Sequence, residues 1–200
     1  MLSRNFARAV MLVLAMAAVQ PGPARAASDP AGFIADLGQQ AMVVLTSQRS
    51  EAEREGQFRT LFDTGFDVPA VARFALGRYW TIASPAQQQE FTTLFTAYMV
   101  HVYAVRFNEF TGQQFKVTGS RPEGDASTLV TSQLGSDGNQ PVKIDWRVAK
   151  VAGGFKITDI VVEGISMMVT QRQEFSAVIQ RGGGDIEALL KPLRAKVRQS

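Results

Sequence analysis

The stretch Val142-Lys-Ile-Asp-Trp-Arg-Val148 decides the fold class, because its apolar and polar residues alternate strictly. Alternation with a period of two is typical of a strand that buries one face and exposes the other. The same period returns on both sides of this stretch, in the pairs Phe115/Val117, Thr128/Val130, Phe155/Ile157 and Ile160/Val162. We therefore predict four strands in this part of the chain.

Short, turn-like segments connect these strands, at residues 121–125, 137–139 and 153–154. Connections of this length join neighbouring antiparallel strands, so we predict a meander. One face of such a sheet can be solvated. Because Asp145 alternates with Ile144 and Trp146, we expect its carboxylate to face water.

Helices are predicted before the sheet, where the apolar period changes to 3.6. Asp29 is a good N-cap with Pro30 at the first helical position, and an apolar stripe follows. Two short helices fit between residues 51 and 76. The longest helix begins at Ser84, where Ser-Pro-Ala-Gln supplies an N-cap, a first-position proline and a capping-box glutamine.

Helices are also predicted after the sheet, one at residues 165–180 and a last one from residue 185, separated by the glycines 182–184. The order helices, sheet, helices predicts an α+β fold, with helices packed on one face of a curved four-stranded antiparallel sheet. A sheet that curls around long helices tends to leave a pocket between the two layers. We find no linker or repeat and assign residues 27–200 to a single domain.

The N-terminal segment has the pattern of a secretory signal peptide. Arg4 and Arg8 precede an uncharged apolar run at residues 9–19, which is too short to span a membrane as a helix. An Ala-Arg-Ala sequence ends at Ala26, so we predict cleavage after this residue or one residue later. The mature protein is then expected in the periplasm.

Composition excludes one class of partner and one kind of cross-link. Residues 1–26 hold three of the 21 Lys and Arg residues and none of the 18 Asp and Glu residues, so the rest of the chain carries equal numbers of the two. A chain without basic excess is not expected to bind nucleic acid. The chain contains no Cys, so disulfides are excluded and its stability must come from a buried core.

Few residues suggest metal binding or nucleophilic catalysis. His101 is the one histidine in the sequence, and we interpret it as a residue on the flank of the long helix. The acidic triplet Glu51, Glu53 and Glu55 lacks the spacing of metal ligands and is interpreted as a solvated helix start. We therefore predict no metal site, no cofactor and no catalytic residue.

One enzymatic alternative stays open, an acid/base pair in a pocket of an α+β fold. Asp145, Asp159 and Glu163 all lie on predicted strands and could supply such a pair. A second alternative is a scaffold protein of the envelope whose helices close on the sheet without a cavity. An enzyme would depend on His101 or an acidic pair, whereas a scaffold would contain no ligand.

Three stretches resemble the MlaC family, also called the toluene-tolerance family, of periplasmic phospholipid-binding proteins. They are Phe66-Asp-Val-Pro-Ala-Val-Ala-Arg-Phe-Ala-Leu-Gly-Arg-Tyr-Trp80, Ser84-Pro-Ala-Gln-Gln-Gln-Glu-Phe91 and Asp159-Ile-Val-Val-Glu-Gly-Ile-Ser166, followed by Gln171-Arg-Gln-Glu-Phe175. The stretches stand in the family's order and span essentially the whole mature chain.

The resemblance implies a function as well as a fold. A lipid-sized apolar cavity between sheet and helices would take acyl tails, and the protein would shuttle lipid between an outer-membrane lipoprotein complex and an inner-membrane ABC transporter. The cargo would be a phospholipid or, as in a subfamily associated with hopanoid biosynthesis, a hopanoid. Such a carrier is expected to be monomeric and to need no cofactor.

Periodicity and this resemblance together select candidate binding residues. Met and aromatic side chains adapt to a flexible apolar ligand. We expect the cavity to be lined or bordered by Phe91, Phe95, Tyr98, Tyr103, Ile144, Trp146, Met167, Met168 and Phe175.

Three further residues are candidates for contact with the lipid headgroup, namely Arg73, Arg78 and Tyr79. An arginine is well suited to a headgroup phosphate. The alternative is structural, because either arginine could form a buried ion pair with Asp67 or Glu163.

Overall fold

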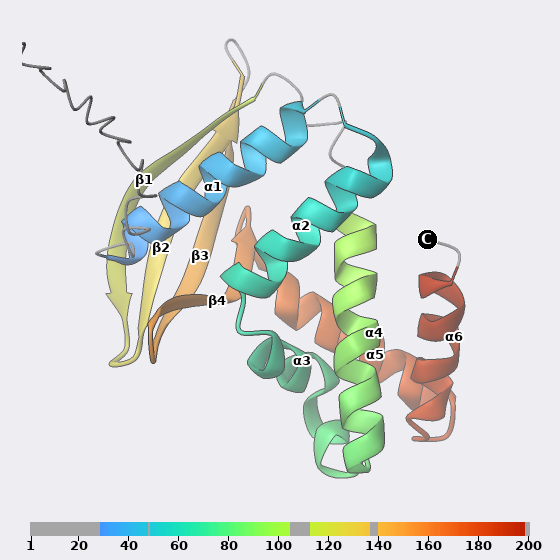
Figure 1. The fold of residues 1–200 in the computed structure, drawn as a ribbon. Helices are drawn as coiled ribbons and strands as arrows, with labels where there is room; N and C mark the ends of the chain where they lie inside the picture. The colour runs from blue at the N-terminus through green and yellow to red at the C-terminus, as the bar shows by residue number, and fades with distance from the viewer. Residues whose placement is uncertain (1–28, 48, 105–112, 137–139, 199–200) are drawn as a thin grey trace, which may run out of the picture.

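The computed structural model describes residues 29–47, 49–104, 113–136 and 140–198 and has the predicted α+β architecture. Within these residues six α-helices lie against a five-stranded antiparallel sheet (Figure 1). The predicted signal peptide, residues 1–26, and the predicted turn at residues 137–139 lie outside the described residues. Both therefore stay predictions.

The sheet is a meander in which every strand pairs with the next one along the chain. Its strands are β1 (Gln114–Glu123), β2 (Ser127–Gly135), β3 (Val142–Val151), β4 (Gly154–Val162) and β5 (Ile165–Ser166). The predicted antiparallel order is confirmed, and each of the four predicted strands is present.

The short fifth strand was not predicted. Glu163 and Gly164 both have positive φ angles, 48° and 84°, and link Val162 to its partner Ile165 across a two-residue turn. A type I′ hairpin turn requires positive φ at both of its central positions. The chain therefore folds back as β5 where we expected helix, and the helix begins only at Met167.

Two β-bulges bend the sheet. The register shifts between Val117 and Gly119 in β1, and again beside Arg147, where Thr158 is the extra residue of β4. A bulge increases the local twist and bends its strand. The sheet is therefore curved, and its concave face receives the helices.

Helix α1 (Pro30–Thr46) lies across β1 and β2 (Figure 1). It starts as predicted, because the side chain of Asp29 accepts a hydrogen bond from the backbone N–H of Gly32. Its buried residue Ile34 packs with Val130, Val148 and Ile157 of the sheet, which makes a small core under this helix.

The other helices form a second layer beside the sheet. They are α2 (Glu51–Gly65), α3 (Val68–Leu76), the 3-10 helix η1 (Gly77–Thr81), α4 (Pro85–Ala104), α5 (Met167–Arg181) and α6 (Glu187–Val197). The predicted capping box at the start of α4 is confirmed, since Ser84 and Gln87 exchange hydrogen bonds. The largest core of the molecule lies among these helices.

Among the described helices, none combines the length and the apolar character needed to cross a bilayer.

Candidate functional site

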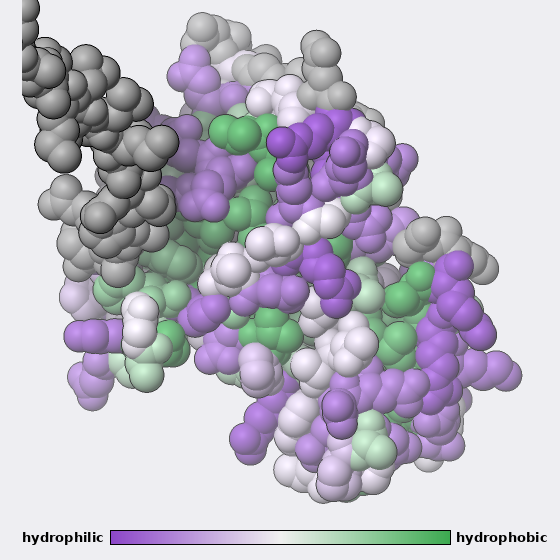
Figure 2. Space-filling model, in the orientation of Figure 1, coloured by the Kyte–Doolittle hydropathy of each residue, from purple (hydrophilic) through white to green (hydrophobic). Residues whose placement is uncertain are grey.

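A cavity of about 380 Å³ lies between the sheet and the helical layer. Its walls are formed by Phe58, Phe62, Phe66, Met99, Tyr103, Leu134, Val142, Ile144, Trp146, Ile160, Val162, Met167 and Met168. All of these residues are aliphatic, aromatic or methionine, and none carries a charge. Figure 2 shows hydrophobic residues gathered in the recess between the sheet and the helices α1 and α2.

The sheet contributes one wall through simple alternation. Ile144 and Trp146 of β3 lie beside Ile160 and Val162 of β4, with Ile144 paired to Val162 and Trp146 paired to Ile160. Cross-strand partners share a face of the sheet. The polar residues between them, such as Asp145, point to the other face.

Helix α2 contributes the facing wall with three phenylalanines at spacings of four residues. Phe58, Phe62 and Phe66 follow one another on one side of the helix and its C-cap, because residues four apart lie on the same helical face. The rings of Phe62 and Phe66 stack with their centroids 4.4 Å apart. The end of α2 is held to the sheet by Lys156, whose ammonium donates to the backbone oxygen of Thr64 over 2.6 Å.

Trp146 lies in the cavity wall, and its indole N–H has a hydrogen-bond partner within the protein. Its Nε1–H donates to the hydroxyl of Ser132 over 2.8 Å, and Ser132 is fully buried. The ring of Phe115 meets the indole edge-on, with centroids 6.1 Å apart. The indole is therefore fixed in orientation and offers only its apolar surface to a ligand.

The methionines at the start of α5 are positioned by a buried carboxylate. Asp159 accepts hydrogen bonds from the backbone N–H of Met168 over 3.1 Å and from the hydroxyl of Ser166 over 2.6 Å. Arg147 binds the same carboxylate and also Glu123 of β1. These bonds tie the first turn of α5 to the sheet and so place Met167 and Met168 against the cavity.

Five of the predicted lining residues lie in the cavity wall: Tyr103, Ile144, Trp146, Met167 and Met168. The structure adds residues that we did not select, namely the three phenylalanines of α2, Met99, Leu134, Val142, Ile160 and Val162. The sequence contains patterns that indicate these residues, namely the spacing of four residues in α2 and the apolar alternation in β4. The sequence does not show which helix faces the sheet.

The other four predicted residues, Phe91, Phe95, Tyr98 and Phe175, do not lie in the cavity wall. Phe91 and Phe95 are 0% exposed and Phe175 is 4% exposed, and their rings pack at centroid distances of 5.8 to 6.3 Å. Tyr98 packs against Phe175 at the border of the same cluster. This side of α4 is turned toward α5 and α6, where helices pack closely and leave no space.

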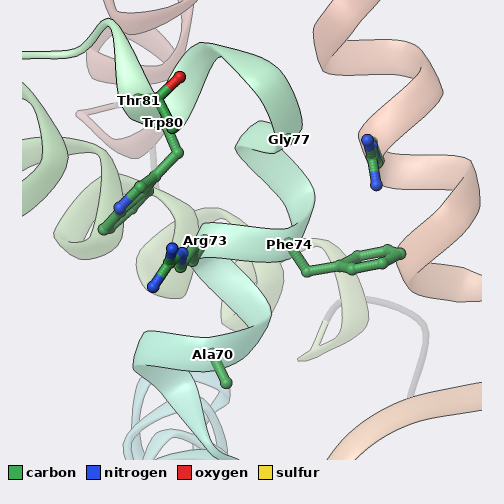
Figure 3. Close-up of a pocket in the computed structure, with 7 residues that line it drawn as sticks. Ala70, Arg73, Phe74, Gly77, Trp80 and Thr81 are labelled. Carbon is green, nitrogen blue, oxygen red and sulfur yellow. The ribbon is translucent and has the colours of Figure 1, made fainter.

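The predicted headgroup residues also lie apart from the cavity wall. Arg78 donates to the hydroxyl of Tyr79 over 3.0 Å and lies over the same ring, which is buried. Arg73 lines a separate surface groove together with Trp80 (Figure 3). The proposed ion pairs are absent from the described residues, because Asp67 caps α3 and Glu163 accepts from the backbone of Lys143.

The acidic residues kept for an enzymatic alternative have structural partners. Asp145 is only 8% exposed, which corrects the expectation that it faces water. The hydroxyl of Thr131 donates to it over 2.6 Å, and Lys143 lies 2.9 Å away. Burial raises the pKa of Asp145, but these two partners outweigh it and lower the pKa below its ordinary value, so the group stays ionised.

None of the acidic residues or His101 lines the cavity. Within the described part of the chain, no three His, Asp or Glu residues are grouped so that they could hold a metal ion. An uncharged apolar wall of this kind offers dispersion contacts and excludes water from a ligand. Its described residues can surround an apolar molecule.

A curved sheet and a helical layer that enclose an apolar cavity define a protein that binds apolar ligands. Residues 36–195 match the family model described as MlaC protein. The chain belongs to the MlaC family.

Two known proteins show the range of this similarity. The toluene tolerance protein ttg2D of Pseudomonas putida is 21% identical over 110 residues, which are 55% of this chain and 51% of that protein. The chain thus matches about half the length of this curated relative. A phospholipid-binding protein from Ralstonia solanacearum, solved in complex with a phospholipid, is 24% identical and superposes with a TM-score of 0.74 over 86% of this chain and 98% of that one. This second similarity confirms the fold.

Proposed function

We propose that this protein is a periplasmic carrier that holds the acyl chains of a lipid in the cavity between sheet and helices. The observation that carries the proposal is the uncharged wall of the cavity, to which three strands, α2, α4 and the start of α5 all contribute apolar side chains. The fold it shares with a protein solved with a bound phospholipid supports a phospholipid as the cargo.

The energetics of the cavity suit a carrier that must also release its cargo. About thirty methylenes of a lipid gain roughly 24 kcal/mol on leaving water, at about 0.8 kcal/mol each. A bilayer buries the same methylenes, so transfer from bilayer to cavity is close to neutral. The protein therefore needs only to exclude water from the chains, and direction must come from its partners.

The predicted signal peptide at residues 1–26 supports a place in the periplasm. There the protein would work as a monomer between an outer-membrane lipoprotein complex and an inner-membrane ABC transporter, as its family membership suggests. It would need neither a cofactor nor a catalytic residue. A hopanoid is the alternative cargo, because a rigid apolar ligand would meet the same wall.

The cavity residues Tyr103, Ile144, Trp146, Met167 and Met168 are proposed to contact the acyl chains. Phe58 and Phe62 of α2 would contact the opposite side of the chains. In this proposal Phe91, Phe95, Tyr98 and Phe175 act indirectly, because their packing holds α4 and α5 in place behind the wall.

The direct test is to purify residues 27–200 from a bacterial periplasm, extract the protein with organic solvent and identify bound lipid by mass spectrometry. A phospholipid in a near one-to-one ratio supports the proposal, and a hopanoid supports its alternative cargo. A protein without lipid contradicts the carrier function and favours the scaffold.

A matched pair of variants tests the location of the lipid. Val162 lines the cavity, whereas its neighbour Val161 pairs with Asp145 and lies on the other face of β4. Burying an amide in an apolar site without a hydrogen-bond partner costs about 1–3 kcal/mol. The variant Val162→Gln should therefore lower the amount of bound lipid at least about fivefold. Val161→Gln should retain it. Equal retention by both folded variants would place the lipid elsewhere.

A further inference from the structure

A second surface outside the cavity combines exposed apolar side chains with arginines. It is formed by α3, η1 and the start of α5, and we call it the α3–α5 face, defined by Arg73, Phe74, Trp80, Val169 and Arg172. Two adjoining grooves of about 400 and 420 Å³ share Phe74 and Ala70 in their walls. Figure 3 shows Arg73 and Trp80 on one side of the first groove, with Phe74 pointing away from them.

The apolar part of this face is open to solvent. Phe74, in the last turn of α3, is 41% exposed, and Val169, in the first turn of α5, is 42% exposed. They line the same groove, so their exposed surfaces adjoin. Adjoining exposed apolar residues with a polar rim mark interaction surfaces more often than single ones do.

The charged part of the face is positive and largely unbalanced. Among the described residues, neither Arg73 nor Arg172 has an ion pair with a carboxylate, whereas Arg194 binds both Glu90 and Glu187. Among the described residues that form the walls of the two grooves, Asp159 is the one carboxylate, and it is bound by Arg147. The face therefore presents guanidinium groups that have no carboxylate partner among the described residues and that lie beside aromatic rings.

The side chain of Arg172 lies close to the backbone of Gly77. Gly77 has a φ of 59°, and a Cβ atom at this residue would lie 2.8 Å from Nε of Arg172. The guanidinium carbon of Arg172 lies 5.2 Å from the ring centroid of Phe74. Two stretches singled out in the sequence, Leu76–Trp80 and Gln171–Phe175, thus meet here although neither forms the cavity wall.

The α3–α5 face is separate from the cavity. Arg147 and Trp146 are consecutive residues of β3 and point to opposite faces of the sheet, one into the second groove and one into the cavity. Met168 is the residue common to both walls, and it is only 3% exposed. The face is therefore not the headgroup end of the cavity.

We propose that the α3–α5 face docks the protein on the anionic surface of a lipid bilayer. Guanidinium groups bind phosphate oxygens in pairs of hydrogen bonds, and basic residues near an anionic membrane each contribute to binding. Trp and Phe side chains, such as Trp80 and Phe74 here, favour the membrane interface. The membrane would then be a direct partner of the proposed carrier, through a face that is separate from its cavity.

The test is co-sedimentation of residues 27–200 with vesicles of phosphatidylcholine alone or mixed equally with phosphatidylglycerol. We expect binding to the anionic vesicles and at least tenfold weaker binding to the neutral ones, with loss of binding at high salt. The variant Arg73→Gln/Arg172→Gln should bind anionic vesicles roughly 30-fold more weakly. Phe74→Ser should weaken binding at every salt concentration.

The matched control is Arg49→Gln/Arg181→Gln, which removes the same charge at two exposed arginines outside both grooves. It should bind within about threefold of the unchanged protein. Equal losses in the two double variants would show that only net charge matters and would overturn the proposal, as would equal binding to neutral vesicles or no vesicle binding at all. Circular dichroism confirms that each variant is folded. If the Arg73→Gln/Arg172→Gln variant still contains lipid, its weaker vesicle binding does not come from a loss of the carrier function.

Discussion

Two apolar regions of this molecule have similar residues but opposite packing. Between α4, α5 and α6, the rings of Phe91, Phe95 and Phe175 fill the space, and none of them is more than 4% exposed. Between the sheet and α2, aromatic and methionine side chains leave a cavity of about 380 Å³. Aromatic content therefore does not distinguish a filled core from a binding site.

The difference comes from the shape of the two layers. Helices of a layer approach one another until their side chains interlock, whereas bulges near Val117 and Thr158 curve the sheet. The concave face of a curved sheet cannot interlock with helices in the same way along its whole length. An apolar cavity too large to be filled by its own walls loses dispersion contacts. A ligand restores them, so the cavity region should gain stability from cargo while the helical core should not.

The largest difference between the regions is expected on truncating one phenylalanine in each. Phe95→Ala removes a ring that is 0% exposed and leaves a new hole, so the free energy of unfolding should fall by about 3–5 kcal/mol. Phe58→Ala enlarges a space that already exists, so the fall should be about half as large. Urea denaturation of lipid-free protein measures both. Equal losses would mean that the cavity is closed in solution.

The second effect concerns the junction of the two regions at Asp159. Asp159→Ala leaves the N–H of Met168 without its acceptor and Arg147 with Glu123 alone, so we expect the free energy of unfolding to fall by about 3 kcal/mol and bound lipid to decrease. Asp63→Ala is the control, since that carboxylate is 49% exposed and lies 3.9 Å from Arg59; its loss should stay below about 1 kcal/mol. A loss of stability without a change in bound lipid would show that α5 does not position the cavity wall.

Most of the fold was predictable because its signals are local. The caps at Asp29 and Ser84 each depend on atoms within three residues, and the strands follow from alternation. The fifth strand was missed because it depends on a positive φ at Glu163, a conformation that a residue other than glycine rarely adopts. Sequence preference argues against a turn at that position, and the β4–β5 pairing overrides it.

The candidate site was only partly predictable because it depends on relative orientation. The sequence shows that α4 has a broad apolar face, and the structure assigns Tyr103 to the cavity but Phe91 and Phe95 to the helical core. Periodicity measures the width of an apolar face and not what covers it. The burial of Asp145 was not predicted for a similar reason, because it depends on a neighbour on another strand, Thr131 of β2.

A third, smaller effect sharpens the comparison by adding one ring to each region. Val162→Phe fills part of the cavity, so stability should rise by about 1 kcal/mol while bound lipid falls. Val100 is 1% exposed in the helical core, and Val100→Phe should lower stability by about 1–3 kcal/mol through overpacking. Thermal unfolding of lipid-free protein gives the sign of each change. A destabilising Val162→Phe would contradict the presence of free space at β4.

The smallest effect tests the face of the sheet that turns away from both regions. The bonds from Thr131 and Lys143 hold the pKa of Asp145 below its ordinary value despite burial. The ionised carboxylate therefore stabilises the fold above about pH 4, the ordinary pKa of a carboxyl group. This stabilisation is lost as the pH falls through the lowered pKa. Asp145→Asn should therefore be less stable than the unchanged protein at pH 7, and the difference should shrink toward pH 3. Asp36→Asn, at an exposed carboxylate of α1, is the control for the loss of one negative charge. A difference that does not change with pH would show that Asp145 contributes through packing and not through its charge.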